Sequence, residues 1–433
     1  MISQLKSQSP FISPSKQAIG SYLGPVSRIG KYILFSKIKN LTGGGVIIHE
    51  NGHQWQFGTT SNGDLHHLFV HNPQFYSNVV LGGSLGAAES YVLREWSTDN
   101  LIRLLRFFLQ NADALQSLDS GLGKILAPFH KIYHRLRTNS LRGSRLNIAA
   151  HYDLGNDFFA KFLDPTIMYS SAYFERDDMT LEEASNSKID IICRKLGLGA
   201  SDHLVEIGCG WGAFAVYAAK NYGCSVTTTT LSREQYRMTK ERLQQAGLKD
   251  RVTVLLEDYR NLSGKFDKLV SIEMIEAVGW QRYPNFFLKC SSLLKPEGQM
   301  LLQSIVIEDQ RYEIAKRHVD FIKRYIFPGG CLPSTTILSS TATAHTDLRL
   351  SHLEDMTHYY IKTLVEWRTR FIDAHDYYLS RGYDKAMIRM WEYYFCYSVA
   401  GFSERRTGVV QLVFDKPGCN RPPVTHSSKI TCH

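Results

Sequence analysis

Short apolar or β-branched runs alternate with helical patterns along the second half of the chain. The runs expected to form strands are 205–207, 225–231, 252–256, 266–272 and 409–414. A helix is expected over 181–196, and Ser232 is expected to open another. Strands that alternate with helices predict a parallel sheet with crossover helices. The pattern therefore indicates an α/β fold.

The ends of these strands carry the first candidate site residues. In a parallel sheet, ligands bind beyond the carboxyl ends of the strands. Gly208, Thr230, Asp258 and Glu273 each lie at such an end. We therefore expect these four residues to converge on one binding site.

Three glycines follow the strand that begins at Val205. The segment has the form Glu206-x-Gly208-x-Gly210-x-Gly212. Glycine permits a positive φ and lets a ligand approach the main chain, and a helix N-terminus supplies free N–H groups. The spacing is tighter than that of dinucleotide-binding loops, and no Lys-Ser/Thr pair follows for a P-loop. The loop suits S-adenosylmethionine, and an ordinary glycine-rich strand–helix turn is the alternative.

The amino-terminal third has a different pattern, which predicts separate units. Val26, Ile29, Ile33 and Phe35 recur at near-helical spacing after Pro25, which predicts an amphipathic helix. Thr98 is expected to cap a helix that starts at 101. The expected domains are a basic segment at 1–64, a small α+β domain at 65–120, a basic linker helix at 121–150, a catalytic domain at 151–416 and a flexible tail at 417–433.

Composition restricts the environment and the partners. The chain has 433 residues, of which 43% are hydrophobic and 21% charged, as in a globular protein. The net charge is +9, and no acidic residue occurs in 1–48 or 120–152, so an anionic partner is expected. Charge alone does not choose among nucleic acid, an acidic metabolite and a lipid headgroup surface. The eight cysteines show no disulfide or metal-site spacing, and no apolar run approaches the ~18 residues that span a bilayer. We expect a cytoplasmic protein without a metal that associates peripherally with membranes.

Taken together, the motifs resemble the cyclopropane-fatty-acyl-phospholipid synthase family, which includes mycolic acid cyclopropane synthases. The likeness runs from about residue 65 to 415. The matching stretches are His151–Asn156, Met168–Ala172, Glu206–Gly212, Thr230–Gln235, Glu276–Gly279, Tyr325–Ser334 and Tyr360–Trp367. The resemblance implies a Rossmann-like class I methyltransferase sheet with a smaller amino-terminal α+β domain and helical additions. It also implies transfer of a carbon from S-adenosylmethionine to the double bond of an unsaturated phospholipid acyl chain, forming a cyclopropane ring. It implies a lipid surface and no nucleic acid as the anionic partner, and it leaves a homodimer open.

The resemblance also assigns cofactor-binding residues. Tyr169 and Ser170 would touch the cofactor from a lid, and the loop of Glu206, Gly208, Gly210 and Gly212 would hold its methionine end. The residues expected at the ribose and adenine are Thr230, Leu231, Gln235, Asp258 and Tyr259.

Members of the family hold a bicarbonate ion near the transferred methyl group. Its site would comprise Ser171, Glu276, Gln303, the backbone of Ile305 and Tyr360. Better-known members carry Cys in place of Ser171 and His in place of Gln303. Both side chains found here can donate hydrogen bonds to an anion.

The reaction needs a positioned alkene, a stabilised carbocation and a base. Glu276 is expected to orient that base, or to act as the base itself when no anion binds. The aromatic residues expected to stabilise a cation are Tyr169, Tyr173, Phe174, Tyr325, Phe327 and Tyr360. Three alternatives to cyclopropane formation remain: methyl or methylene branching of the acyl chain, methylation of a soluble acceptor, and non-catalytic lipid binding.

Overall fold

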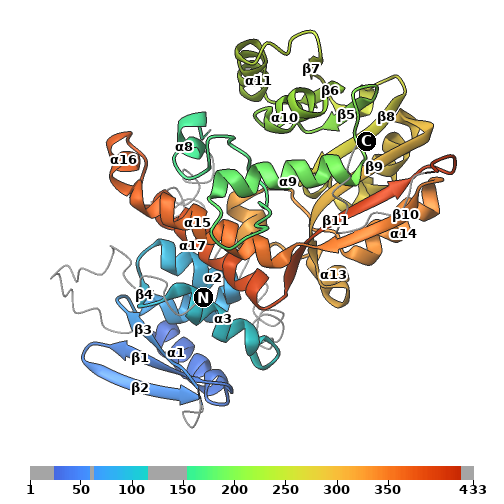
Figure 1. Ribbon diagram of the computed structural model, residues 1–433. Helices are drawn as coiled ribbons and strands as arrows, with labels where there is room; N and C mark the ends of the chain where they lie inside the picture. Colours follow the sequence, from blue (N-terminus) through green and yellow to red (C-terminus); the bar gives the residue numbers. More distant parts are fainter. Residues whose placement is uncertain (1–23, 59–62, 116–153, 421–433) are drawn as a thin grey trace. The chain divides into compact units, whose positions relative to one another are not determined.

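The computed structural model describes residues 24–58, 63–115 and 154–420 (Figure 1). The chain forms two compact units. The smaller unit combines the described residues up to 115 with 319–328 and 371–404, and the larger unit combines 154–318, 329–370 and 405–420. Each unit is therefore assembled from segments that are far apart in the sequence.

The larger unit contains a seven-stranded sheet with the order β10-β11-β9-β8-β5-β6-β7. Its strands are β5 (His203–Ile207), β6 (Ser225–Thr230), β7 (Val252–Leu256), β8 (Phe266–Ile272), β9 (Leu294–Ile307), β10 (Arg349–Asp355) and β11 (Thr407–Asp415). Strands β5 to β9 pair in parallel, whereas β11 is antiparallel to both β9 and β10. The predicted Rossmann-like sheet is confirmed.

Helices surround this sheet. They are α8 (Asn156–Ala160), α9 (Leu181–Lys195), α10 (Ala213–Tyr222), α11 (Arg233–Gln245), α12 (Tyr283–Leu293), α13 (Asp309–Ala315), α14 (Thr335–His345) and the first part of α15 (Thr357–Asp373). One buried cluster joins residues of α9 and α10 to the sheet, and another joins α12 and α14 to it. Strands buried by helices in this way carry the continuous apolar runs seen in the sequence.

Local sequence signals explain where the key helices begin. Thr180 and Glu183 form a reciprocal capping box at the start of α9, which confirms the helix expected there. The Ser232 side chain accepts a hydrogen bond from the Gln235 backbone and caps α11, as predicted.

The smaller unit is built on a four-stranded sheet with the order β2-β1-β3-β4. Its elements are α1 (Pro25–Ile38), β1 (Gly45–Glu50), β2 (His53–Gly58), β3 (Leu65–Val70), α2 (Gln74–Val92), β4 (Trp96–Thr98), α3 (Leu101–Gln110), α16 (His375–Ser380) and α17 (Lys385–Ser403). The helix expected after Pro25 is confirmed. Its Gly30, Leu34 and Ile38 are buried.

Three expectations differ from the structure. The boundary placed at residue 64 separates β1 from β3, which pair in parallel within one sheet. The expected catalytic domain from 151 includes 319–328 and 371–404, which cluster with the smaller unit. Asn100, rather than Thr98, caps α3, because Thr98 still belongs to β4 while the Asn100 side chain accepts from the Arg103 backbone. The linker helix expected at 121–150 lies outside the described residues.

Candidate active site

The glycine loop connects β5 to α10, and its backbone favours glycine at each of its three positions. Gly208, Gly210 and Gly212 have φ values of 95°, 50° and 86°. A Cβ on Gly212 would lie 2.7 Å from the Thr239 side chain, and one on Gly208 would lie 3.1 Å from Met274. A Cβ on Gly210 would meet no atom within 4 Å. Gly210 therefore leaves open space beside the main chain, which a cofactor can use.

The residues expected at the ribose lie together in the turn after β6. Thr230 donates a hydrogen bond of 2.7 Å from its hydroxyl to the Gln235 amide oxygen, and the Ser232 backbone donates to the Thr230 hydroxyl. The Leu231 side chain is exposed. The turn thus presents a hydroxyl, an amide and an apolar side chain within six residues of the chain.

The residues expected at the adenine follow β7. Arg260 donates to both carboxylate oxygens of Asp258, at 2.9 and 2.6 Å, and these hydrogen bonds lower the pKa of Asp258. The Tyr259 ring packs edge-on against Phe286, with ring centroids 5.7 Å apart. Asp258 is therefore held ionised at the end of its strand, and contact with adenine stays a prediction.

The expected lid segment, which contains Tyr169, Ser170 and Ser171, is fixed by aromatic packing and by one buried cation. The Tyr169 ring lies 5.5 Å from Phe159 and 5.2 Å from Trp367, measured between centroids. The Ser170 hydroxyl accepts a hydrogen bond of 2.8 Å from Lys188, and Lys188 also contacts the Met168 sulfur. The position of the lid thus depends on a side chain of α9.

Lys188 is a site residue that the sequence analysis did not find. It is fully buried, and burial lowers its pKa to about 8 although Glu273, Asp164 and Glu206 favour the charged form. Its spacing of four residues from the buried Ala184 places it on the buried side of α9. The sequence did contain a signal for this residue, namely a lysine at a position on the apolar face of the predicted helix. A buried ammonium group needs hydrogen-bond acceptors or opposite charges, so such a lysine indicates a polar site.

The Glu206 side chain is buried at the end of β5 that carries the glycine loop, and it is not exposed to a binding site. Only 3% of the residue is exposed, and its carboxylate accepts a hydrogen bond of 2.6 Å from Thr228 on the neighbouring strand. Burial raises the pKa of Glu206 to about 7, while Thr228 and Lys188 oppose the shift. We propose that Glu206 positions the loop through β5.

Glu273, which follows β8, joins three of the residues expected around bicarbonate. Its Oε1 accepts from the Ser171 backbone at 2.9 Å and from the Gln303 amide at 2.8 Å. Its Oε2 accepts from the Tyr360 hydroxyl at 3.0 Å. The lid, β9 and α15 therefore meet at one carboxylate.

Glu276 and Ile305, the other two residues expected around bicarbonate, are hydrogen-bonded to each other. Glu276 Oε1 accepts from the Ile305 backbone at 2.6 Å and from the Ser304 hydroxyl at 2.9 Å. Burial, and then the charge of Glu273, raise the pKa of Glu276 to about 8. At neutral pH most of Glu276 is therefore protonated.

Most of the donors expected for bicarbonate are already in use. The Ser171 backbone, Gln303, Tyr360 and the Ile305 backbone are bonded to carboxylates of this chain. The Ser171 hydroxyl donates to the Ala172 carbonyl, whereas Glu276 Oε2 is buried without a hydrogen-bond partner among the described residues. Binding of bicarbonate stays a prediction.

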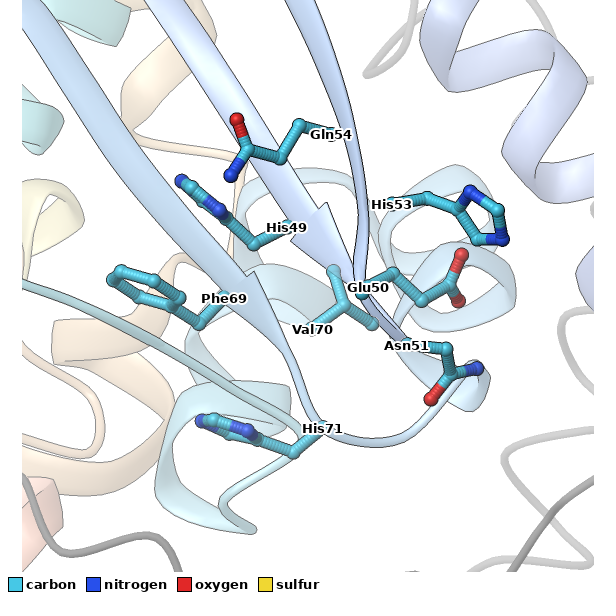
Figure 2. A pocket seen from close by; sticks show the side chains of 9 residues that line it. His49, Glu50, Asn51, His53, Gln54, Phe69, Val70 and His71 are labelled. Carbon is cyan, nitrogen blue, oxygen red and sulfur yellow. The ribbon is translucent and has the colours of Figure 1, made fainter.

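A separate surface hollow lies in the smaller unit and contains none of the expected site residues. Figure 2 shows its side chains on β1, β2 and β3, with His49 beside Phe69 and with His71 near the end of β3. His49 bonds to His67 at 2.9 Å, and His71 bonds to Ser97 at 2.7 Å. No group of three or more His, Cys, Asp and Glu in the described ranges could hold a metal ion. This hollow is not the candidate active site.

The fold and the site define a class I methyltransferase that uses S-adenosylmethionine. Residues 139–412 match the sequence model of the family described as mycolic acid cyclopropane synthetase. The chain belongs to this family.

Relatives and solved structures agree with this assignment. The tuberculostearic acid methyltransferase UfaA1 of Mycobacterium tuberculosis is 37% identical over 81% of this chain and 83% of its own length. The cyclopropane-fatty-acyl-phospholipid synthase of Escherichia coli is 36% identical over 80% of this chain and 87% of its own length. The mycolic acid cyclopropane synthase CmaA1, solved with SAH and CTAB, aligns with a TM-score of 0.57 and 34% identity over 62% of this chain and 97% of its own. Coclaurine N-methyltransferase shares the fold, with a TM-score of 0.57 at 20% identity, over 76% of this chain and 98% of its own.

We predict that Gly210→Val abolishes cofactor binding by filling the space beside the loop. For the wild-type protein, a cofactor concentration of about 100 Kd should add roughly 2.7 kcal/mol of stability, measurable as a raised melting temperature. Gly247→Val is the matched control. Gly247 also has a positive φ, of 68°, and open space beside it, but lies after α11 away from the loop. Both variants should lose stability, and only the Gly247 variant should keep the shift. A shift retained by Gly210→Val would contradict this site.

We predict that Glu276→Gln changes the pH dependence of stability. The pKa of Glu276 is raised from 4.5 to about 8, so the folded protein binds this proton more tightly than the unfolded chain does. Its contribution is full below pH 4.5 and is lost as the pH rises to about 8, by at most ~1.4 kcal/mol per pH unit. Urea unfolding between these pH values should show a smaller loss of stability for the variant than for the wild type. Equal slopes would show that Glu276 titrates normally.

Proposed function

We propose that this protein transfers a one-carbon unit from S-adenosylmethionine to the double bond of an unsaturated phospholipid acyl chain and forms a cyclopropane ring. The observation that carries the proposal is the pair of carboxylates in the turn after β8, Glu273 and Glu276, which accompanies the glycine loop after β5. Ring formation needs a proton acceptor beside the delivered carbon, which a buried carboxylate can supply. The names of the relatives support the same substrate class.

Each part of the site has one task in this reaction. Bound S-adenosylmethionine supplies an electrophilic methyl carbon. The glycine loop and the turn of Thr230 and Gln235 hold the cofactor, so that the alkene meets that carbon in one orientation. Positioning of this kind contributes up to roughly 7–11 kcal/mol. The lid, held by Lys188 through Ser170, excludes water from the electron-deficient carbon.

An aromatic group next to Glu273 suits a cationic centre. The rings of Tyr169 and Tyr360 both pack on Trp367, at centroid distances of 5.2 and 5.9 Å. The Tyr360 hydroxyl also bonds to Glu273, so the ring lies beside the carboxylate. An aromatic face stabilises a cation by about 0.5–2 kcal/mol. Of the other expected rings, Tyr325 and Phe327 belong to the smaller unit.

One relative favours a second candidate. UfaA1 is named as a tuberculostearic acid methyltransferase, so branching of the acyl chain is the alternative to a ring. The same first transfer serves both reactions, and the two differ in which carbon loses its proton. A soluble acceptor is a third alternative, which the structure does not specifically favour.

We also propose that α1 brings the protein to the membrane surface. Among the described helices, none is long and apolar enough to cross a bilayer. The exposed side of α1 nevertheless carries Val26, Ile29 and Tyr32, which are 59%, 61% and 78% exposed, next to the basic Arg28. A helix of this kind can lie in the headgroup region of an anionic membrane. A homodimer stays a prediction, which analytical ultracentrifugation would test.

We predict that expression of the protein adds one CH₂ to unsaturated phospholipid chains of a bacterial host that lacks cyclopropane lipids. Mass spectrometry would detect the addition. Ozonolysis would then identify the product, because a cyclopropane chain resists cleavage and a methylene branch does not. A cleaved product would favour branching. Unchanged lipids with a folded, cofactor-binding protein would contradict the proposed function.

We predict that binding to vesicles depends on charge and on the exposed side of α1. Binding to vesicles that contain an anionic phospholipid should fall with salt, since each basic residue near the surface contributes about 1 kcal/mol. Ile29→Asp should weaken binding about tenfold, because an apolar contact of ~1.5 kcal/mol is lost. Leu288→Asp on α12, which changes a residue that is 47% exposed in the larger unit, is the control. Equal effects of both substitutions in cosedimentation would contradict a role for α1.

A further inference from the structure

The most informative feature beyond the proposed reaction is the placement of Glu273. Three donors from three separate elements converge on its carboxylate, as described above. The backbone there has a φ of 48°, in the left-handed region that few non-glycine residues adopt. Its backbone N–H also donates to the Gln303 carbonyl at 2.8 Å. The fold thus holds a strained residue in place from both its main chain and its side chain, a combination found at functional sites.

We infer that Glu273 is the proton acceptor of the reaction and takes the place that a bound bicarbonate ion has in the family resemblance. The inference rests on the proposed function. The C–S bond of the cofactor breaks as a C–C bond to one alkene carbon forms, which leaves a carbocation at the other carbon. A C–H bond of the delivered carbon then breaks, its proton passes to the Glu273 carboxylate, and its electron pair forms the second C–C bond of the ring.

The surroundings of Glu273 suit this role. Burial raises its pKa, and the hydrogen bonds from Ser171, Gln303 and Tyr360, together with the charge of Lys188, oppose that shift. Three hydrogen-bond donors and a buried ammonium favour the ionised form of this carboxylate, while burial makes it more basic than in water, as a proton acceptor requires. Lys188 also supplies positive charge that offsets the negative charge of Glu273 before the proton arrives.

Glu276 does not suit the same role. Its Oε1 already accepts from the Ile305 backbone and the Ser304 hydroxyl, and its Oε2 is buried without a hydrogen-bond donor in the described part of the chain. Burial together with the charge of Glu273 raises its pKa to about 8. A protonated carboxyl cannot accept the ring-closing proton. Glu276 instead acts as a positioning residue that joins the turn after β8 to β9.

The test compares Glu273→Gln with Glu276→Gln, which are both nearly isosteric. Lipid product would be measured in buffer depleted of bicarbonate, with the cofactor-induced melting shift as the check of folding and binding. Wild-type activity should not change on depletion. Glu273→Gln should lower the rate by about 10²-fold or more, within the range for loss of a general base, whereas Glu276→Gln, which alters a positioning residue, should lower it by less.

Glu273→Gly supplies a test that does not depend on an isosteric side chain. Glycine relieves the positive φ and leaves the three donors available to a small anion. Added bicarbonate, formate or acetate should then restore activity that the variant lacks in their absence. Wild-type activity that requires bicarbonate, a fully active Glu273→Gln enzyme, or a larger loss in Glu276→Gln would each overturn the inference. Wild-type protein that binds cofactor and yields no lipid product would instead overturn the proposed function, and the inference with it.

Discussion

The burial of a single ammonium group, that of Lys188, constrains the whole site. An isolated charge of this kind is costly to remove from water, so it persists only where carboxylates and hydrogen-bond acceptors surround it. Glu206 and Glu273 provide the opposing charges from the ends of β5 and β8, and Ser170 accepts one of its protons in a hydrogen bond. The lid and the two strand ends are therefore coupled through one side chain. A displaced lid would leave this ammonium with fewer acceptors.

The pairing of the central strands explains why glutamine suits position 303. In the sheet, Ile272 is opposite Gln303, and Gln411 on β11 is opposite Gln303 on its other side. Lys195 donates to the Gln411 oxygen at 2.6 Å, and the Gln411 amide donates to the Gln303 oxygen at 2.9 Å. Since that oxygen is used, the Gln303 NH₂ group points toward Glu273. A chain of hydrogen bonds that begins at a buried lysine thus fixes the donor of the active site.

The predictable part of the site is the part that depends on local sequence. The tight turn after β5 has a positive φ at three positions, so glycines in the sequence indicate where it lies. Thr230 and Gln235 lie within one capped turn, which a short sequence motif also indicates. The role of Glu273 could not be derived, although its place at a strand end was predicted. The choice between Glu273 and Glu276 depends on the direction of a short turn, which sets the carboxylate that Ser171 and Tyr360 can reach. Lys188 lay on a helix face that looked amphipathic, and its partners are distant in sequence. The composition of the two units could not be predicted either. Residues 371–404 join the smaller unit through contacts between segments distant in sequence, which the periodicity of apolar residues does not encode.

A proton acceptor that is part of the chain differs physically from one that must bind. A bound anion loses translational freedom at each encounter, and its occupancy follows its concentration, whereas Glu273 is present at every turnover. In return, the folded protein must keep a charged group and a strained backbone in place without substrate. The three donors and Lys188 offset that cost only while the lid, β9 and α15 remain in contact with the turn after β8. When a side chain replaces a diffusible base, the presence of the base depends on the stability of the fold rather than on the concentration of an anion. The position of the lid and the transfer of the proton then depend on the same contacts.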